Sequence, residues 1–173
     1  MKKIKLTLVL TLISVLSFSQ TDFKWEKVDS VKKDKNQIYS DTKMFIAETW
    51  KSAQNVIQND DKEGGMILIK GMTKQTINVG MGALVTFNYV YSVKFYFKEG
   101  KYKIVLDDVK YQDCGVGCDG PAWSTFGNPQ DTNVGGMYKK KWEILMAQLK
   151  AELQGIVDGY EKYIQTPSAN TGW

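Results

Sequence analysis

The stretch VTFNYVYSVKFYFK, residues 85–98, decides the fold. Every second position is apolar and bulky, whereas polar side chains fill most of the positions between them. Successive side chains of a β-strand point to opposite faces of the sheet, so this alternation predicts one long, half-buried strand. The side expected to face the core carries Val85, Phe87, Tyr89, Tyr91, Val93, Phe95 and Phe97. The other side carries Thr86, Asn88, Ser92, Lys94 and Lys98, with Val90 and Tyr96 among them.

The segment that follows predicts a partner strand. Residues 99–100 are a two-residue turn signal, so residues 101–111 are expected to return antiparallel as the second strand of a β-hairpin. The apolar pattern of that second strand changes phase after Leu106. One extra residue in a strand causes such a change, and we therefore expect a β-bulge at Asp107 and Asp108.

The chain before the hairpin predicts further strands and a helix. Ser40 or Asp41 can cap a helix that runs to Gln58, because apolar residues recur there at helical spacing. The turn-forming sequence NDDKEGG then ends that helix. The expected strands are residues 24–31, 66–72 and 76–79, with a loop at 32–39 and a turn at 59–65.

The chain after the hairpin predicts a long loop and a second helix. Residues 112–137 lack periodicity and are rich in Gly, Asp and Asn, as in long surface loops. Residues 138–164 have the spacing of an amphipathic helix, and residues 166–173 are expected to be a flexible tail. The expected apolar stripe of the helix consists of Trp142, Leu145, Leu149, Ile156, Tyr160 and Ile164.

These elements follow the order β-α-β-β-β-β-α and predict an α+β fold. Strands of this kind with two amphipathic helices are expected to form an antiparallel sheet of about five strands backed by the two helices. The expected core belongs to a single domain, residues 20–165.

Four stretches of the chain carry a family resemblance. They are KWEKVDSV (24–31), TWKSAQNVIQ (49–58), DDKEGGMILIKG (60–71) and YSVKFYFKEGKYKIVLDDVKY (91–111). In this order and spacing they resemble the domain of unknown function 4468 family, secreted bacterial proteins with a TATA-binding-protein-like fold. The resemblance covers residues 24–111 and, more loosely, the terminal helix. It implies a half-saddle sheet but no activity, because a fold does not carry a function with it.

The N-terminus predicts export. Lysines in MKKIK precede the apolar run LTLVLTLISVL and a small-residue exit, SFSQ, as in a signal peptide comprising residues 1–19. The apolar run is shorter than the roughly 20 residues of a membrane-spanning helix. No cysteine follows it, so a lipoprotein is not expected. We expect a bacterial protein in the periplasm or outside the cell, with no membrane span in the mature chain.

Charge and composition disfavour nucleic acid as a partner. The net charge of +4 falls to +1 once Lys2, Lys3 and Lys5 leave with the signal peptide. Every basic residue is lysine, so the bidentate arginine contacts that read guanine or hold phosphate are unavailable.

The two cysteines, Cys114 and Cys118, lie in the loop sequence DCGVGC. An exported protein favours a structural disulfide, and the glycines between the cysteines let so short a loop close. The alternatives are redox-active or free thiols and a metal site. The metal site is disfavoured because the chain has no histidine and only carboxylates such as Asp113 and Asp119 lie nearby.

Two classes of function remain, and the sequence favours the first. It is a non-enzymatic binding module that contacts an envelope protein, peptide or glycan through Tyr96 on the polar sheet face, or through Trp123 and Phe126 in the loop. The second is a carboxylate-based enzyme with its site near Asp107 and Asp108 and the loop. Such chemistry would lack histidine, the commonest general base. No metal and no cofactor is expected, and self-association through a sheet edge or the terminal helix is a third alternative.

Overall fold

The computed structural model describes residues 23–113, 125–127 and 139–167. The predicted signal peptide, Cys114, Cys118, Trp123 and the tail from residue 168 lie outside these ranges. In chain order the elements are β1 (Trp25–Ser30), α1 (Lys35–Thr49), α2 (Ala53–Val56), β2 (Ile57–Asp61), β3 (Met66–Gly80), β4 (Ala83–Lys98), β5 (Lys101–Asp113), β6 (Thr125–Gly127) and α3 (Lys139–Gln165).

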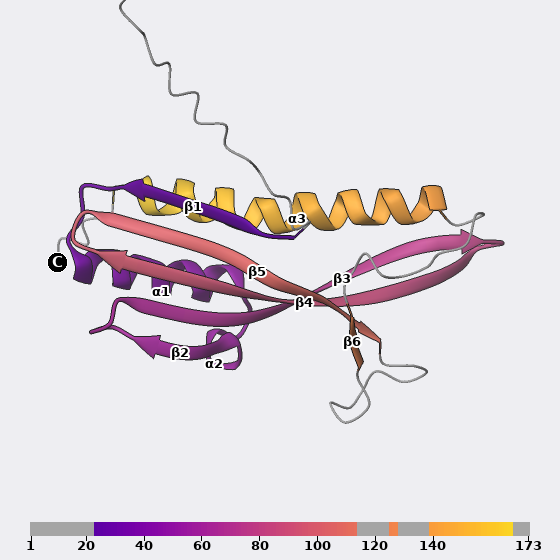
Figure 1. Ribbon diagram of the computed structural model, residues 1–173, viewed down its shortest axis with the longest axis horizontal. Coiled ribbons are helices and arrows are strands. Elements are labelled where there is room, and N and C mark those ends of the chain that lie inside the picture. The colour runs from indigo at the N-terminus through magenta and orange to yellow at the C-terminus, as the bar shows by residue number, and fades with distance from the viewer. Residues whose placement is uncertain (1–22, 114–124, 128–138, 168–173) are drawn as a thin grey trace, which may run out of the picture.

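The strands form one antiparallel sheet in the order β1-β5-β4-β3-β2, and β6 pairs with the end of β5 (Figure 1). In this register Phe95 of β4 lies opposite Ile67 of β3 and Ile104 of β5. Because side chains alternate along each strand, the register gathers the apolar residues of three strands on one face. The predicted α+β class with an antiparallel sheet and helices is confirmed.

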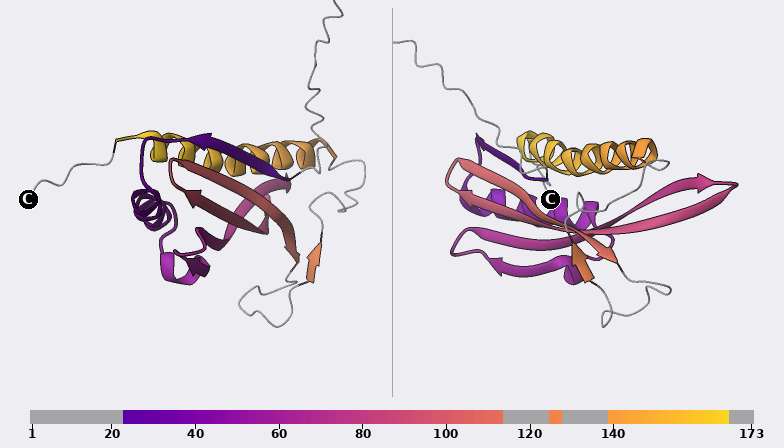
Figure 2. Two further views of the ribbon diagram at one scale, coloured as in Figure 1. Left: turned by 60° about the vertical axis from the view of Figure 1, so that its left-hand side comes forward. Right: turned by 45° about the vertical axis from the view of Figure 1, so that its right-hand side comes forward.

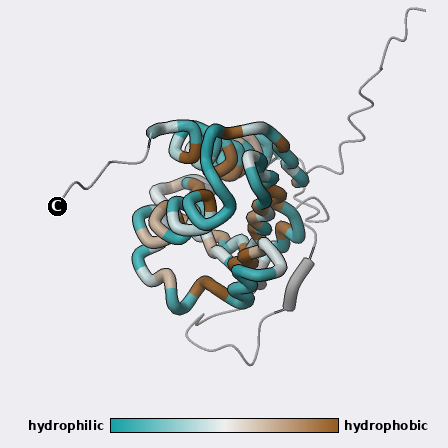
Figure 3. Tube along the Cα trace, turned by 90° about the vertical axis from the view of Figure 1, so that its left-hand side faces the viewer, coloured by the Kyte–Doolittle hydropathy of each residue, from teal (hydrophilic) through white to brown (hydrophobic). Residues whose placement is uncertain are grey.

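Helices α1 and α3 pack on the apolar face of the sheet, which we call the inner face (Figure 2). Neither helix covers the opposite face, which we call the outer face. Figure 3 looks along the molecule and shows hydrophobic positions alternating with hydrophilic ones along the elements. The core therefore lies between the inner face and the two helices.

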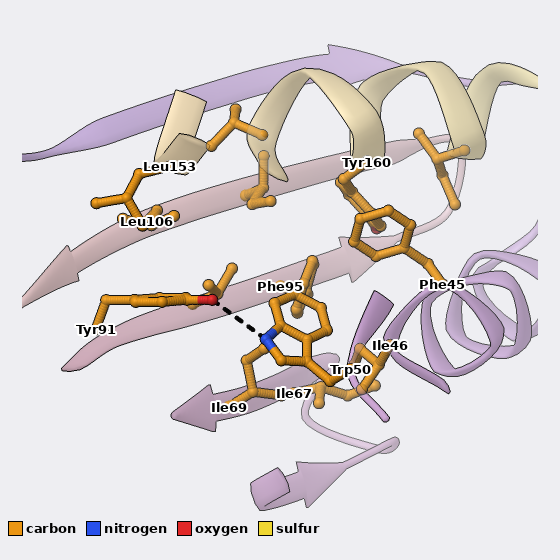
Figure 4. Close-up of a cluster of buried hydrophobic side chains, with 14 of the residues drawn as sticks. Phe45, Ile46, Trp50, Ile67, Ile69, Tyr91, Phe95, Leu106, Leu153 and Tyr160 are labelled. Atoms are coloured by element: carbon orange, nitrogen blue, oxygen red, sulfur yellow. Dashed lines mark hydrogen bonds between the residues drawn. The ribbon is translucent and has the colours of Figure 1, made fainter. Parts of the chain in front are cut away.

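The three elements of the core meet at aromatic side chains (Figure 4). The ring centroid of Tyr160 on α3 lies 5.2 Å from that of Phe45 on α1 and 4.8 Å from that of Phe95 on β4. The Tyr160 hydroxyl is 2.8 Å from Thr42 Oγ1, which donates to the carbonyl oxygen of Ile38 at 2.7 Å. Since that bond uses the only Thr42 hydroxyl proton, Tyr160 is the donor to Thr42. A buried chain of hydrogen bonds thus ties α3 to α1.

A second junction joins α1 to the centre of the sheet. The Trp50 indole Nε1 donates to the Tyr91 hydroxyl at 3.3 Å (Figure 4). The Tyr91 ring lies over Gly71, its partner on β3, and a Cβ atom at Gly71 would come within 2.4 Å of that ring. Glycine at position 71 therefore leaves the space that the tyrosine ring fills.

The first helix differs from its predicted range. It begins at Lys35, not at Ser40 or Asp41, because the Asp34 side chain accepts a hydrogen bond from the Gln37 backbone at 2.8 Å and caps the helix there. It also ends at Thr49, well before Gln58. Trp50 has extended backbone angles, and its side chain turns back to Tyr91.

Three further expectations about the strands were wrong. Residues 57–61, expected to be the end of a helix and the start of a turn, form strand β2 on the edge of β3. The separate strands expected at 66–72 and 76–79 are one strand, because β4 pairs with β3 without interruption between them. The expected loop at 112–137 does not begin at residue 112, because β5 runs to Asp113. Strand β6 also lies within the range expected for the loop.

The hairpin and its bulge are confirmed. Gly100 has a φ of +67° in the turn between β4 and β5, a conformation that glycine adopts at little cost. The pairing passes from Val90 opposite Lys110 to Ser92 opposite Asp107, so β5 has one residue too many. Asp108 takes a φ of +55° within this bulge.

The terminal helix lies close to its predicted range. Its buried side chains are Leu145, Leu149, Leu153, Val157, Tyr160 and Ile164. Trp142 and Ile156, which were expected in this stripe, are only partly buried. None of the helices described here is long and apolar enough to cross a membrane.

Candidate functional site

Tyr96 lies near one end of the outer face. Alternation along β4 points it away from the helices, between Met66 of β3 and Lys103 of β5 in the pairing register. Its side chain remains 36% exposed, whereas Phe95 and Phe97 on either side of it are buried in the core. The strand pattern that builds the core therefore also presents an aromatic ring on the uncovered face.

A hollow of about 530 Å³ opens beside Tyr96. Its walls come from the β4–β5 hairpin, from β1 and from the turn before β3. The lining residues are Val28, Gly64, Gly65, Tyr96, Phe97, Lys98, Lys101, Tyr102 and Lys103. Val28 is 58% exposed, so an apolar side chain and an aromatic ring both face this space.

Lysines give the hollow a positive charge. Lys98 and Lys101 are directly opposite each other across the hairpin, and neither forms an ion pair with any residue that the structure describes. Like charges in such a pair are unfavourable for the sheet, so sheet stability does not explain them. Lys103 holds its ammonium 5.9 Å from the Tyr96 ring centroid and forms an ion pair with Glu26 at 2.6 Å.

The ion pair between Lys103 and Glu26 shows how charge is balanced at the rim of the hollow. The hydrogen bond from Lys103 lowers the pKa of the Glu26 carboxyl below its ordinary value. Glu26 thus neutralises Lys103 and leaves Lys98 and Lys101 uncompensated. An anionic group at the hairpin end of the hollow would meet these two ammonium groups.

A second hollow of about 350 Å³ lies beside the bulge on the outer face. Its lining includes Met72, Val90, Asp108 and Lys110. Asp107 accepts from Lys94 at 2.7 and 2.9 Å, and Asp108 forms an ion pair with Lys110 at 2.6 Å. The bulge turns both aspartates to the outer face, and each is bound to its own lysine.

The described residues contain no group of three acidic or other ligating side chains that could hold a metal ion. Glu26 on β1 and the adjacent Asp107 and Asp108 on β5 are each bound to a lysine. Beside them, the described part of this face presents the Tyr96 ring and the ammonium groups of Lys98 and Lys101.

Comparisons with known proteins agree with the α+β fold. A family model described as a domain of unknown function (DUF4468) with TBP-like fold matches residues 23–112. The chain belongs to this family. The match includes β1 to β5 and both hollows, whereas α3 follows it in the sequence.

A solved structure supports the fold of this DUF4468 chain. A DUF4468 family protein from Bacteroides ovatus is 14% identical, with a TM-score of 0.56 over 85% of this chain and 88% of that one. A TBP-like protein from Parabacteroides distasonis is 12% identical, with a TM-score of 0.47 over 80% of this chain and 92% of that one. At such identities the first likeness shows the fold alone. No curated protein is significantly similar in sequence.

Of the binding residues predicted from the sequence of this DUF4468 protein, Tyr96 lines a hollow. Phe126 is in β6, opposite Gln112 of β5, and Trp123 lies outside the described residues. Cys114 and Cys118 lie outside them too, so their pairing stays a prediction.

The lysine cluster at the hairpin end was not among the residues predicted from the sequence. A signal was present, because the alternation of residues 85–98 already put Lys98 on the same side as Tyr96. The pairing register then brings Lys101 and Lys103 of the next strand beside them.

Proposed function

We propose that this chain is a non-enzymatic binding module of the bacterial envelope, exported by the signal peptide predicted at residues 1–19. Its partner lies on the outer face of the sheet, in the hollow beside Tyr96. One observation carries this proposal: a hollow of about 530 Å³ on the uncovered face combines an exposed aromatic ring with uncompensated lysines. Aromatic side chains on rigid strands supply contact area at a low entropy cost.

The lining of the hollow indicates what such a partner carries. The Tyr96 ring and Val28 offer apolar surface, which suits the face of a sugar ring or an apolar side chain. Lys98 and Lys101 offer two ammonium groups that attract a carboxylate or another anion. The partner is therefore an acidic glycan, or an acidic segment of an envelope protein or peptide.

A carboxylate-based enzyme has weaker support. A general acid or base needs a carboxyl group free to exchange a proton with the substrate. Asp107 receives two hydrogen bonds from Lys94, and Asp108 is bound to Lys110.

Pull-down of envelope material with the mature protein, followed by direct titration of the glycans and peptides recovered, tests the proposal. Tyr96→Ala is expected to weaken binding about tenfold, as for an aromatic contact residue. The matched control is Met44→Ala, because Met44 is 56% exposed on α1, away from the outer face.

A charge variant gives a second readout. Replacing Lys98 and Lys101 together by alanine is expected to weaken binding and to reduce its salt dependence. The reason is that the attraction between the two ammonium groups and the anionic partner is removed. Lys162→Ala in the last turn of α3 is the control for loss of charge. Binding that survives both the Tyr96 and the lysine variants unchanged would refute a site in this hollow.

A further inference from the structure

The β3–β4 hairpin projects beyond the rest of the sheet (Figures 1 and 2). Pairing of β2 with β3 ends at Ile69, and pairing of β5 with β4 ends at Asn88. Residues 75–87 therefore form a two-stranded segment, which we call the distal ribbon, with its turn at Met81 and Gly82. The ribbon has only two strands, and its turn is the outermost part of the described chain at the end opposite the β4–β5 turn (Figure 1).

The tip of the distal ribbon is apolar and exposed. Met81 is fully exposed, and Leu84 is 68% exposed. Met81 has a φ of +51° and Gly82 one of +80°, as in the tight turns that normally carry Asn-Gly or Asp-Gly. Methionine is unfavourable at the first of these positions for two reasons. Its backbone rarely adopts a positive φ, and its apolar side chain is exposed to water. Met81 therefore does not stabilise the ribbon, and we take its apolar side chain as a sign of a role outside the ribbon.

Lysines lie beside the tip. Lys141 of α3 donates from Nζ to the carbonyl oxygen of Asn78 at 2.6 Å, which places the start of α3 at the level of the Asn78–Leu84 pair. Lys139 and Lys140 precede it and are exposed, and the first turn of α3 has no acidic residue. Positive charge is unfavourable at this end of a helix, so helix stability does not explain these lysines.

An anionic lipid surface fits this combination better than a protein does. A stable protein interface buries about 800 Å² on each partner, which a narrow convex tip cannot supply. A lipid surface needs no such area, because one or two apolar side chains can enter the interface while lysines attract the anionic headgroups.

We propose that the tip of the distal ribbon docks on anionic lipid, with Met81 and Leu84 entering the interface and the exposed Lys139 and Lys140 facing the headgroups. This contact is separate from the hollow beside Tyr96 on the outer face. It holds the exported protein against a membrane without a transmembrane segment, and leaves the hollow free for its partner.

Flotation of the exported protein with vesicles tests the proposal. Vesicles of phosphatidylglycerol and phosphatidylcholine in equal amounts are compared with phosphatidylcholine alone, at low and at high salt. We expect binding to the anionic vesicles only, and weaker binding at high salt because the headgroup attraction is screened. No binding to anionic vesicles would overturn the proposal. Binding to soluble polyglutamate without binding to vesicles would overturn it in favour of an acidic protein partner.

Variants locate the contact. Met81→Ser combined with Leu84→Ser is expected to lower the partition coefficient at least about tenfold, because insertion of two apolar side chains is lost. Lys140→Gln is expected to lower it about fivefold. Met44→Ser, on the helix side of the molecule, should have no effect, and circular dichroism should show all variants folded. Vesicle binding that the tip and lysine variants leave unchanged would assign it to another surface.

One variant separates insertion from charge attraction. Met81→Lys adds a positive charge but removes the apolar side chain at the turn. If the tip inserts, this variant binds more weakly than the natural protein at high salt, where electrostatic attraction is screened. Equal or stronger binding at high salt would refute insertion. Tyr96→Ala should leave vesicle binding unchanged, so failure of the lipid contact and failure of the proposed partner site can be told apart.

Discussion

The hydrogen-bond chain between α3 and α1 predicts a measurable coupling between two buried hydroxyls. Tyr160 donates to Thr42, and Thr42 donates to the carbonyl of Ile38, with both side chains fully buried. The perturbation is a double-mutant cycle that removes each hydroxyl singly and then both. Tyr160→Phe and Thr42→Val keep the shape of each side chain, so packing changes little.

The magnitudes follow from which group loses its partner. Tyr160→Phe removes a donor and leaves Thr42 bonded to Ile38, so it should cost about 1 kcal/mol. Thr42→Val leaves the Tyr160 hydroxyl buried without an acceptor, which should cost about 2 kcal/mol. In the double variant no orphaned hydroxyl remains, so the total should be about 2 kcal/mol rather than the sum of the two.

Equilibrium unfolding in guanidinium chloride, followed by tryptophan fluorescence, gives the four free energies of unfolding. Equal m-values across the set would show that the variants compare the same two states. The expected coupling free energy is about 1 kcal/mol. Additive losses, with no coupling, would show that the two hydroxyls do not form the chain seen between the helices.

Four more predictions are open to simple measurement. Tyr89→Phe should leave the melting temperature unchanged or raise it, because the buried Tyr89 hydroxyl has no hydrogen-bond partner among the described residues. Gly71→Ala should lower the free energy of unfolding by about 1–3 kcal/mol, since the added methyl meets the aromatic ring opposite. Burial raises the pKa of Tyr160 above its ordinary value, so above about pH 10 this hydroxyl ionises in the unfolded chain but not in the folded one. The free energy of unfolding should therefore fall as the pH rises above about 10, and it should fall less steeply in Tyr160→Phe. Thiol titration of the denatured exported protein should find no free thiol if Cys114 and Cys118 form a disulfide, and two thiols would refute it.

The sequence was most informative where one strand has two different environments. Residues 85–98 alternate because β4 lies at the centre of the sheet, with a core on one side and solvent on the other. The phase change after Leu106 likewise reports a local property of one strand, and the bulge lies where it was predicted.

The first helix and β2 could not be found in this way. The turn that begins α1 consists of Lys35, Asn36 and Gln37, so apolar periodicity starts only at Ile38. The helix itself begins earlier, because Asp34 caps it. Strand β2 is an edge strand whose residues after Ile57 are all polar and exposed, so it has the composition of a turn. Only pairing with β3, across the turn at residues 62–65, makes these residues a strand.

The candidate site was predicted in part for a related reason. The pattern of β4 alone indicated that Tyr96 faces away from the core. Whether Lys101 and Lys103 lie beside it depends on the pairing register of β5. The same holds for the lysines near Met81, since α3 follows the ribbon by more than fifty residues and meets it only in the folded chain.

The distal ribbon has a consequence for how the domain opens. An isolated two-stranded hairpin is marginally stable in water, and this one has support on one face, where Trp142 of α3 lies 5.5 Å from Phe87 between ring centroids. Loosening the first turns of α3 would therefore release the ribbon as a cooperative unit while the six-stranded body stays intact. Amide hydrogens of residues 75–87 would then exchange ahead of those in the centre of β4, and a protease could reach the hairpin in an otherwise native molecule.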